Sequence, residues 1–192
     1  MSDFPLLAIT DAATCPRPLL AQIERLATLT TRRPQAIVLR AKNLPADEYR
    51  TLAQAAQNIC NTHKLPLILH SDWQLANALQ IDGLHLPLAL LRQLPQAERK
   101  HFAWLSTSVH SVCEAQEAES LGANVLIAGH IYATQCKAGL PPRGVEFLQA
   151  VCSSVKVPVY AIGGIGFDST QHAELAAHGA RGACIMSAYM RL

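Results

Sequence analysis

The chain has 192 residues, of which 50% are hydrophobic and 16% are charged, and its formal net charge at pH 7 is +2. This length and composition predict a single globular domain over residues 1–192 and exclude a disordered chain. The small net charge and the lack of basic runs argue against a nucleic-acid partner, and no apolar segment has the length of a membrane span.

The cysteines and the amino-terminal residues indicate the compartment. The six cysteines form no C-x-x-C pair and no spacing typical of zinc ligands, and several lie in apolar patterns. The first residues have no basic and apolar leader pattern. The sequence therefore predicts a reduced, cytoplasmic protein.

Short apolar segments alternate with helical patterns along the whole chain. Leu19, Ile23 and Leu26, for example, recur at helical spacing between the first two segments. The eight predicted strands are residues 6–9, 36–40, 66–69, 83–86, 102–109, 125–131, 157–163 and 183–187. This alternation predicts a compact α/β protein with the (β/α)8 TIM-barrel fold, with an open doubly wound sheet as the alternative.

Capping patterns predict where two of the helices begin or end, whereas no helix is predicted after the last strand. Ser111 and Glu114 form a capping-box pattern, and Asp168 or Ser169 opens a helix that ends at Gly179. The connections at residues 71–80 and 87–99 are short for helices. Only residues 188–192 follow the last predicted strand, too few for a closing helix. We therefore expect a partner subunit to cover that flank, as in a homodimer.

Polar side chains follow several predicted strands, where the active site of a barrel lies. Arg40 and Lys42 end the second strand, and alternation places them on one face, where both can reach an anionic substrate. Ser108 ends the fifth strand. The alternative for each is a solvated strand end.

His130 lies at the end of the sixth predicted strand, close in sequence to the polar residues Tyr132, Thr134 and Lys137. A histidine with an ordinary pKa of about 6.5 can accept and return a proton. His130 is therefore the candidate catalytic residue, with a histidine satisfied inside the barrel as the alternative.

A phosphate site is predicted after the last two strands. Gly163 and Gly164 lie between the seventh strand and a capped helix, and Met186 and Ser187 end the eighth strand. Paired glycines let backbone amides approach an anion, and these two loops form the recurrent phosphate site of barrels. The alternative for the glycine pair is a simple tight turn.

The chain also resembles a known family in five segments that occur in the family's order. They are Ile9-Thr10-Asp11, Arg40-Ala41-Lys42, Asp82-Gly83-Leu84-His85-Leu86, Ser108-Val109-His110-Ser111 and Ala161-Ile162-Gly163-Gly164-Ile165. They are similar to the thiamine phosphate synthase superfamily, whose fold is a (β/α)8 barrel. Residues 129–140 and 143–145 are similar to its thiazole tautomerase (TenI) branch. In that branch, the histidine that matches His130 is the acid/base residue.

The departures from the synthase pattern concern magnesium and pyrophosphate. Synthases hold both with an Asn-Asp pair after the third strand, where this chain has His70 and Ser71, and with an acidic residue after the fourth, where it has residues 87–90. Without these carboxylates we expect no metal, no cofactor and no synthase activity.

The resemblance then implies an isomerase of thiamine biosynthesis, a thiazole tautomerase. It would aromatise a carboxylated dihydrothiazole phosphate by proton transfer through His130, with Arg40, Lys42, Ser108, Lys137 and the phosphate site as substrate-binding residues. Two alternatives remain open. One is a thiamine phosphate synthase-like enzyme with an atypical site, and the other is a non-catalytic thiazole- or thiamine-phosphate-binding protein.

Overall fold

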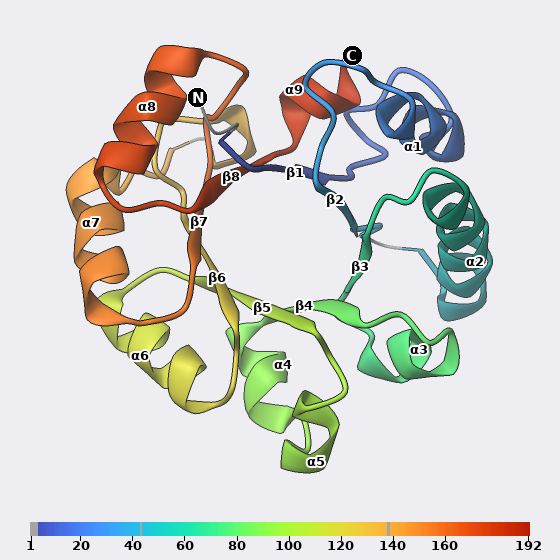
Figure 1. Ribbon diagram of the computed structural model, residues 1–192, viewed down its shortest axis with the longest axis horizontal. Coiled ribbons are helices and arrows are strands. Elements are labelled where there is room, and N and C mark those ends of the chain that lie inside the picture. Colours follow the sequence, from blue (N-terminus) through green and yellow to red (C-terminus); the bar gives the residue numbers. More distant parts are fainter. Residues whose placement is uncertain (1–3, 43, 138) are drawn as a thin grey trace.

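Eight parallel strands close into a barrel in chain order, β1 to β8, with β1 paired to β8 (Figure 1). The computed structural model describes residues 4–42, 44–137 and 139–192. The strands are β1 Leu6–Ile9, β2 Ala36–Leu39, β3 Leu67–His70, β4 Gly83–Pro87, β5 Trp104–Val109, β6 Val125–Gly129, β7 Val159–Ile162 and β8 Gly182–Ile185. The predicted barrel is confirmed, and the open sheet is excluded.

Helices surround the barrel as an outer ring (Figure 1). They are α1 Leu19–Ala27, α2 Ala46–Thr62, α3 Trp73–Ala78, α4 Leu88–Gln93, α5 Gln96–Arg99, α6 Val112–Ser120, α7 Gly144–Ser154, α8 Ser169–Ala177 and α9 Ser187–Met190, with a 3-10 turn η1 at Gln135–Lys137. Side chains of Asp72, Ser111 and Asp168 accept hydrogen bonds from backbone amides at the starts of α3, α6 and α8. None of the helices in the described ranges is long and apolar enough to cross a membrane.

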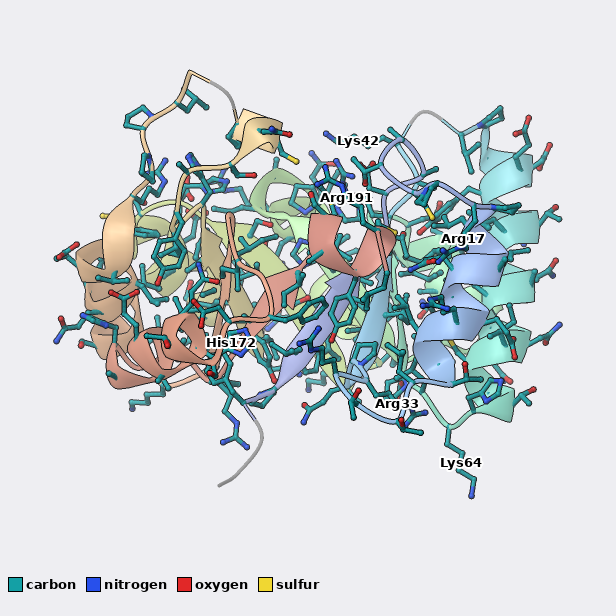
Figure 2. All side chains as sticks on the ribbon, turned by 90° about the horizontal axis from the view of Figure 1, so that it is seen from above. Arg17, Arg33, Lys42, Lys64, His172 and Arg191 are labelled. Carbon is teal, nitrogen blue, oxygen red and sulfur yellow. The ribbon has the colours of Figure 1, made fainter. Side chains whose placement is uncertain are left out.

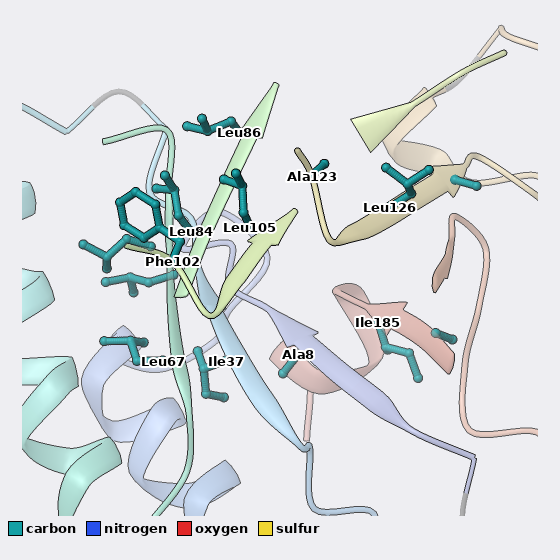
Figure 3. Close-up of a cluster of buried hydrophobic side chains, with 14 of the residues drawn as sticks. Ala8, Ile37, Leu67, Leu84, Leu86, Phe102, Leu105, Ala123, Leu126 and Ile185 are labelled. Atoms are coloured by element: carbon teal, nitrogen blue, oxygen red, sulfur yellow. The ribbon is translucent and has the colours of Figure 1, made fainter. Parts of the chain in front are cut away.

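The core has two layers because strand side chains alternate between the two faces of the barrel. Leu84, Leu105 and Leu126 belong to the outer layer, which also contains the buried faces of the helices (Figure 3). The inner layer draws its fully buried members from strands alone, including Ile9, Val38, Ile68, Ile127 and Cys184. Residues in phase with this inner layer therefore point into the barrel.

A short helix covers the flank after β8. Although α9 has only four residues, Tyr189 and Met190 are fully buried. The Tyr189 hydroxyl donates to the Arg32 carbonyl at 2.9 Å, and the Tyr189 ring packs edge-on against Phe167. Where we expected a partner subunit to cover this flank, α9 packs against it. The homodimer itself stays a prediction.

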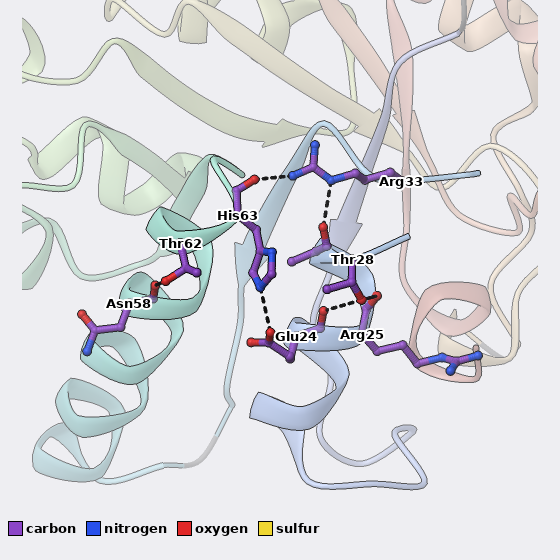
Figure 4. A network of polar contacts seen from close by, with 8 residues as sticks. Glu24, Arg25, Thr28, Arg33, Asn58, Thr62 and His63 are labelled. Atoms are coloured by element: carbon purple, nitrogen blue, oxygen red, sulfur yellow. Dashed lines mark hydrogen bonds and ion pairs between the residues drawn. The ribbon is translucent and has the colours of Figure 1, made fainter. Parts of the chain in front are cut away.

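A polar network joins α1 to α2 at the end of the barrel away from the strand C-termini. The His63 ring contacts Glu24 at 2.7 Å, and Arg33 donates to the His63 carbonyl at 2.6 Å (Figure 4). Arg33 and Lys64 lie at the lower edge of Figure 2, whereas Lys42 lies at the upper edge. The two ends are thus distinct, and the predicted site residue Lys42 lies at the carboxyl end of the strands.

Candidate active site

The mouth of the barrel places Arg40 next to Asp11. Both residues follow inner-layer positions, Val38 and Ile9, by two residues, so alternation directs both side chains inward. Arg40 Nη1 lies 3.4 Å from Asp11 Oδ1, and the Arg40 amide donates to Thr10 Oγ1 at 2.8 Å. Strand alternation therefore predicted the location of Arg40, and the hydroxyl of Thr10, directly after β1, accepts a hydrogen bond from the Arg40 backbone amide.

A cavity of about 660 Å³ opens beside Arg40, between the ends of β2 and β3. Its lining residues are Arg40, Ala41, Lys42, Leu44, Ala46, Tyr49, His70, Ser71, Asp72, Trp73, Gln74, Leu90 and Gln93. Burial, together with the charges of Arg40 and Lys42, lowers the pKa of His70 to about 4. His70 is therefore neutral at pH 7, and Arg40 and Lys42 supply the positive charge of this cavity.

The carboxylates of this cavity region do not fit a magnesium site. Asp11 faces Arg40, and one oxygen of Asp72 accepts the Leu75 amide at 2.9 Å as the cap of α3. Within residues 4–42, 44–137 and 139–192, no three His, Cys, Asp or Glu side chains are grouped to hold a metal ion. Mg²⁺ prefers several oxygen ligands in octahedral geometry. The donors therefore do not match the magnesium that the synthase pattern implies.

A second cavity, of about 430 Å³, lies at the end of β6. His110, Gly129, His130, Lys137, Leu140, Pro141, Pro142, Arg143 and Phe147 line it. His130 Nε2 is inaccessible to solvent and has no hydrogen-bond partner among the described residues. A buried ring nitrogen without a partner is costly, and a bound polar ligand would satisfy it.

The segment that carries Lys137 is closed at its base by two backbone hydrogen bonds. The Arg143 amide donates to the His130 carbonyl at 3.0 Å, and the Gly144 amide donates to the Ile131 carbonyl at 3.1 Å. The His110 ring donates through Nδ1 to the Gly129 carbonyl at 2.7 Å. His130 and Lys137 both line this cavity, and their roles in catalysis and binding stay predictions.

The glycine pair after β7 has a packing role that the sequence did not predict. A Cβ at Gly163 would lie 2.3 Å from the His130 Cβ, and one at Gly164 would lie 2.6 Å from the Ala133 carbonyl oxygen. Both glycines have positive φ, of 102° and 69°. Within the described ranges, the amides of Gly164 and Ile165 donate to no protein acceptor. The pair is thus required for close packing and leaves two amides free for an anion.

Met186 and Ser187 lie where β8 passes into α9 and are partly exposed. The structure brings them to the same end of the barrel as Gly163 and Gly164 because β7 and β8 are neighbours. None of these four residues lines either cavity. The phosphate site therefore stays a prediction.

Ser108 contacts His85, a residue to which the sequence analysis assigned no role. His85 is 5% exposed, and its Nε2 lies 3.0 Å from Ser108 Oγ. Its neighbours Leu84 and Leu86 belong to the outer layer, so alternation puts His85 inside the barrel. A histidine between two leucines of a predicted strand was the signal that could have found it.

Three comparisons relate the chain to known proteins. The sequence matches the family described as thiamine monophosphate synthase (TMP-TENI) over residues 6–189. It is 32% identical to a thiamine-phosphate synthase of Syntrophomonas wolfei, over 98% of this chain and 90% of that protein. It is 37% identical to a thiamine-phosphate synthase of Herpetosiphon aurantiacus, over 98% and 89%.

The solved structures agree with the fold. A thiamine phosphate pyrophosphorylase from Pyrococcus furiosus superposes with a TM-score of 0.79 at 28% identity, covering 97% of this chain and 87% of that one. FabK from Thermotoga maritima, at 20% identity and a TM-score of 0.70, shares the fold alone. The relatives carry the name of a synthase, which is a transferase, so the prediction of an isomerase was wrong.

Proposed function

The chain belongs to the thiamine monophosphate synthase (TMP-TENI) family, and on this premise we propose that it is a synthase-like transferase with an atypical, carboxylate-poor site. Its substrates are a phosphorylated thiazole and a pyrimidine that carries a diphosphate. Family membership and the names of the relatives support the reaction class, and the residues at the mouth of the barrel support its details.

The reaction requires the protein to stabilise a leaving anion. The thiazole nitrogen forms a bond to the methylene carbon of the pyrimidine, the bond from that carbon to the diphosphate oxygen breaks, and pyrophosphate departs with the electron pair. Negative charge therefore grows on pyrophosphate in the transition state. Positive groups fixed at that point lower the barrier because they do not reorganise during the reaction.

The observation that carries this proposal is the cavity that contains both Arg40 and Lys42. Neutral His70 adds hydrogen-bonding capacity there without adding charge. A guanidinium binds phosphate oxygens in bidentate fashion, whereas an ammonium acts as a point charge. In this proposal the two cations bind the departing pyrophosphate, and no step passes through a metal ion.

The thiazole phosphate is assigned to the opposite side of the barrel. β2 and β6 lie across the barrel from each other in the closed order of eight strands (Figure 1). The free amides of Gly164 and Ile165 lie near His130, which Gly163 contacts, and Lys137 shares a cavity with His130. We assign the phosphate to these amides, together with Met186 and Ser187, and a hydrogen bond to the ligand to His130 Nε2.

The test is a coupling assay with pure protein, the thiazole phosphate and the pyrimidine diphosphate. We expect thiamine phosphate and pyrophosphate to appear in equal amounts, with chelator present. If no product forms above the level of a protein-free control, with or without added magnesium, the transferase proposal is wrong.

One observation favours a second function, that of a non-catalytic protein that binds thiazole or thiamine phosphate. No group of carboxylates suited to a metal ion is found in the described part of the chain. Such a protein would bind either ligand in calorimetry, and the ligand would be recovered unchanged from the coupling assay. The same samples therefore separate the two functions.

A further inference from the structure

A chain of hydrogen bonds inside the barrel leads from a buried serine to Ser108 at the mouth. Ser106, His85 and Ser108 all point inward, since Trp104, two residues before Ser106, packs on the inner layer. His85 Nδ1 lies 2.9 Å from Ser106 Oγ, and His85 Nε2 lies 3.0 Å from Ser108 Oγ. Ser106 is fully buried, whereas Ser108 is partly exposed. Ser108 is therefore the end of the chain that a ligand can reach.

The direction of the hydrogen bonds is set at the buried end. The Ser106 hydroxyl donates to the Leu84 carbonyl at 3.3 Å, and a carbonyl oxygen accepts only. With its single proton directed to that carbonyl, Ser106 accepts from His85 at 2.9 Å, which places the imidazole proton on Nδ1.

The imidazole is neutral in this position. Burial, and next the neighbouring His70, lower the pKa of His85 to about 3. The His70 ring lies 5.3 Å from the His85 ring, and its own Nδ1 contacts Ser71 at 2.6 Å. A neutral histidine with its proton on Nδ1 has a lone pair on Nε2, so Nε2 accepts the Ser108 proton.

We propose that His85 is a positioning residue that fixes Ser108 as a hydrogen-bond acceptor toward the ligand. With its proton committed to His85, Ser108 offers only lone pairs to the mouth of the barrel. It therefore selects a heterocycle that presents an amino or ring N–H group and disfavours one that presents a carbonyl. The assignment of that heterocycle to a pyrimidine rests on the proposed function, whereas the tautomer of His85 does not.

The first test is ¹⁵N NMR of the full chain, with the His85 signals assigned by their loss in His85→Gln. We expect Nδ1 to be protonated and Nε2 to be an unprotonated acceptor at pH 7. In Ser106→Ala, Nδ1 loses its acceptor and the proton moves partly or wholly to Nε2. Thr107→Val is the matched control: it removes a buried hydroxyl on the same strand that donates to the Leu86 carbonyl at 2.7 Å. The control should leave the His85 signals unchanged. A wild-type His85 with its proton on Nε2 would overturn the inference.

The second test compares two pyrimidine phosphates that differ in one group, amino in one and carbonyl in the other. We expect the wild-type protein to bind the amino compound about tenfold more tightly, a ratio that one mispaired hydrogen bond produces. Ser106→Ala should reduce this preference, and Thr107→Val should keep it. A wild-type preference for the carbonyl compound would overturn the inference. If neither compound binds, the pyrimidine part of the proposed function is wrong. The ¹⁵N NMR measurement of the His85 tautomer then still tests whether His85 fixes Ser108 as an acceptor.

Discussion

Gly163 and His130 are packed so closely that a Cβ at Gly163 would lie 2.3 Å from the His130 Cβ. β7 and the residues after β6 approach each other at this point, where the Ile131 amide donates to the Ile162 carbonyl at 2.9 Å. The orientation of His130 therefore depends on the absence of a side chain at Gly163.

The first prediction concerns this contact. Gly163→Ala should destabilise the fold by about 2–4 kcal/mol, because it adds a steric overlap to the strain of a φ of 102°. Urea unfolding measures this change. Two glycines serve as controls, since a Cβ would meet nothing within 4 Å at either. Gly139→Ala carries the φ strain alone, and Gly166→Ala carries neither cost. Equal losses for Gly163→Ala and Gly139→Ala would contradict the contact.

The segment after β7 shows which features the sequence could predict. Gly163 and Gly164 predicted a phosphate loop, because a glycine pair before a capped helix is typical of one. The close packing against His130 depends on the distance between two strands, which no local pattern contains. The positions of Arg40 and Ser108 were predictable because period-two alternation fixes the face of each residue.

Other elements depended on tertiary packing. The connections at residues 71–80 and 87–99 were expected to be short for helices, yet α3 forms in the first, and α4 and α5 form in the second. Leu88, Leu91 and Leu94 are each at most 9% exposed, and packing against the barrel stabilises so short a segment. The role of His85 was not predicted for a similar reason, because its hydrogen bonds are to Ser106 and Ser108 on the neighbouring strand β5.

The second prediction concerns pH. The pKa of His70 is lowered to about 4 and that of His85 to about 3, from an ordinary value of 6.5. Below pH 6.5 the unfolded chain binds protons that the folded chain does not. The unfolding free energy therefore decreases as the pH is lowered from 6.5 to the folded-state pKa values. Between pH 7 and pH 5, each histidine should remove about 2 kcal/mol of unfolding free energy.

Urea unfolding of His85→Gln at the two pH values tests this dependence. The variant should lose less stability than the wild type on acidification, whatever its stability at pH 7. His101→Gln, at an exposed site beside Glu98, should keep the wild-type dependence. A wild-type stability that is unchanged from pH 7 to pH 5 would show that neither histidine is held neutral.

The third prediction concerns the charge of the 660 Å³ cavity. Lys42→Gln should weaken pyrophosphate binding by about tenfold, the loss of one charge-assisted contact. Lys64→Gln makes the same change of charge at the opposite end of the barrel and should leave the affinity unchanged (Figure 2). Calorimetry measures both. Equal weakening by the two variants would indicate a general effect of net charge rather than a site.

The fourth prediction concerns metal removal. Asp11 is paired with Arg40 and Asp72 caps α3, so neither carboxylate is arranged to hold magnesium. We expect EDTA to leave the Kd for pyrophosphate unchanged, while added salt weakens binding because charged side chains carry it. Binding that disappears in EDTA and returns with magnesium would contradict this description of the cavity.

The fifth prediction concerns the short helix α9, which packs against the flank after β8. Tyr189→Phe should cost about 1–2 kcal/mol of unfolding free energy, because the Arg32 carbonyl loses its donor. Tyr189→Ala should cost about 3–5 kcal/mol, because a fully buried ring against Phe167 is also lost. Tyr160→Phe is the matched control, since the described residues provide no partner for its hydroxyl. Chemical denaturation at several protein concentrations measures all three, and a stability that rises with concentration would indicate that a second subunit, and not Tyr189 alone, holds this flank.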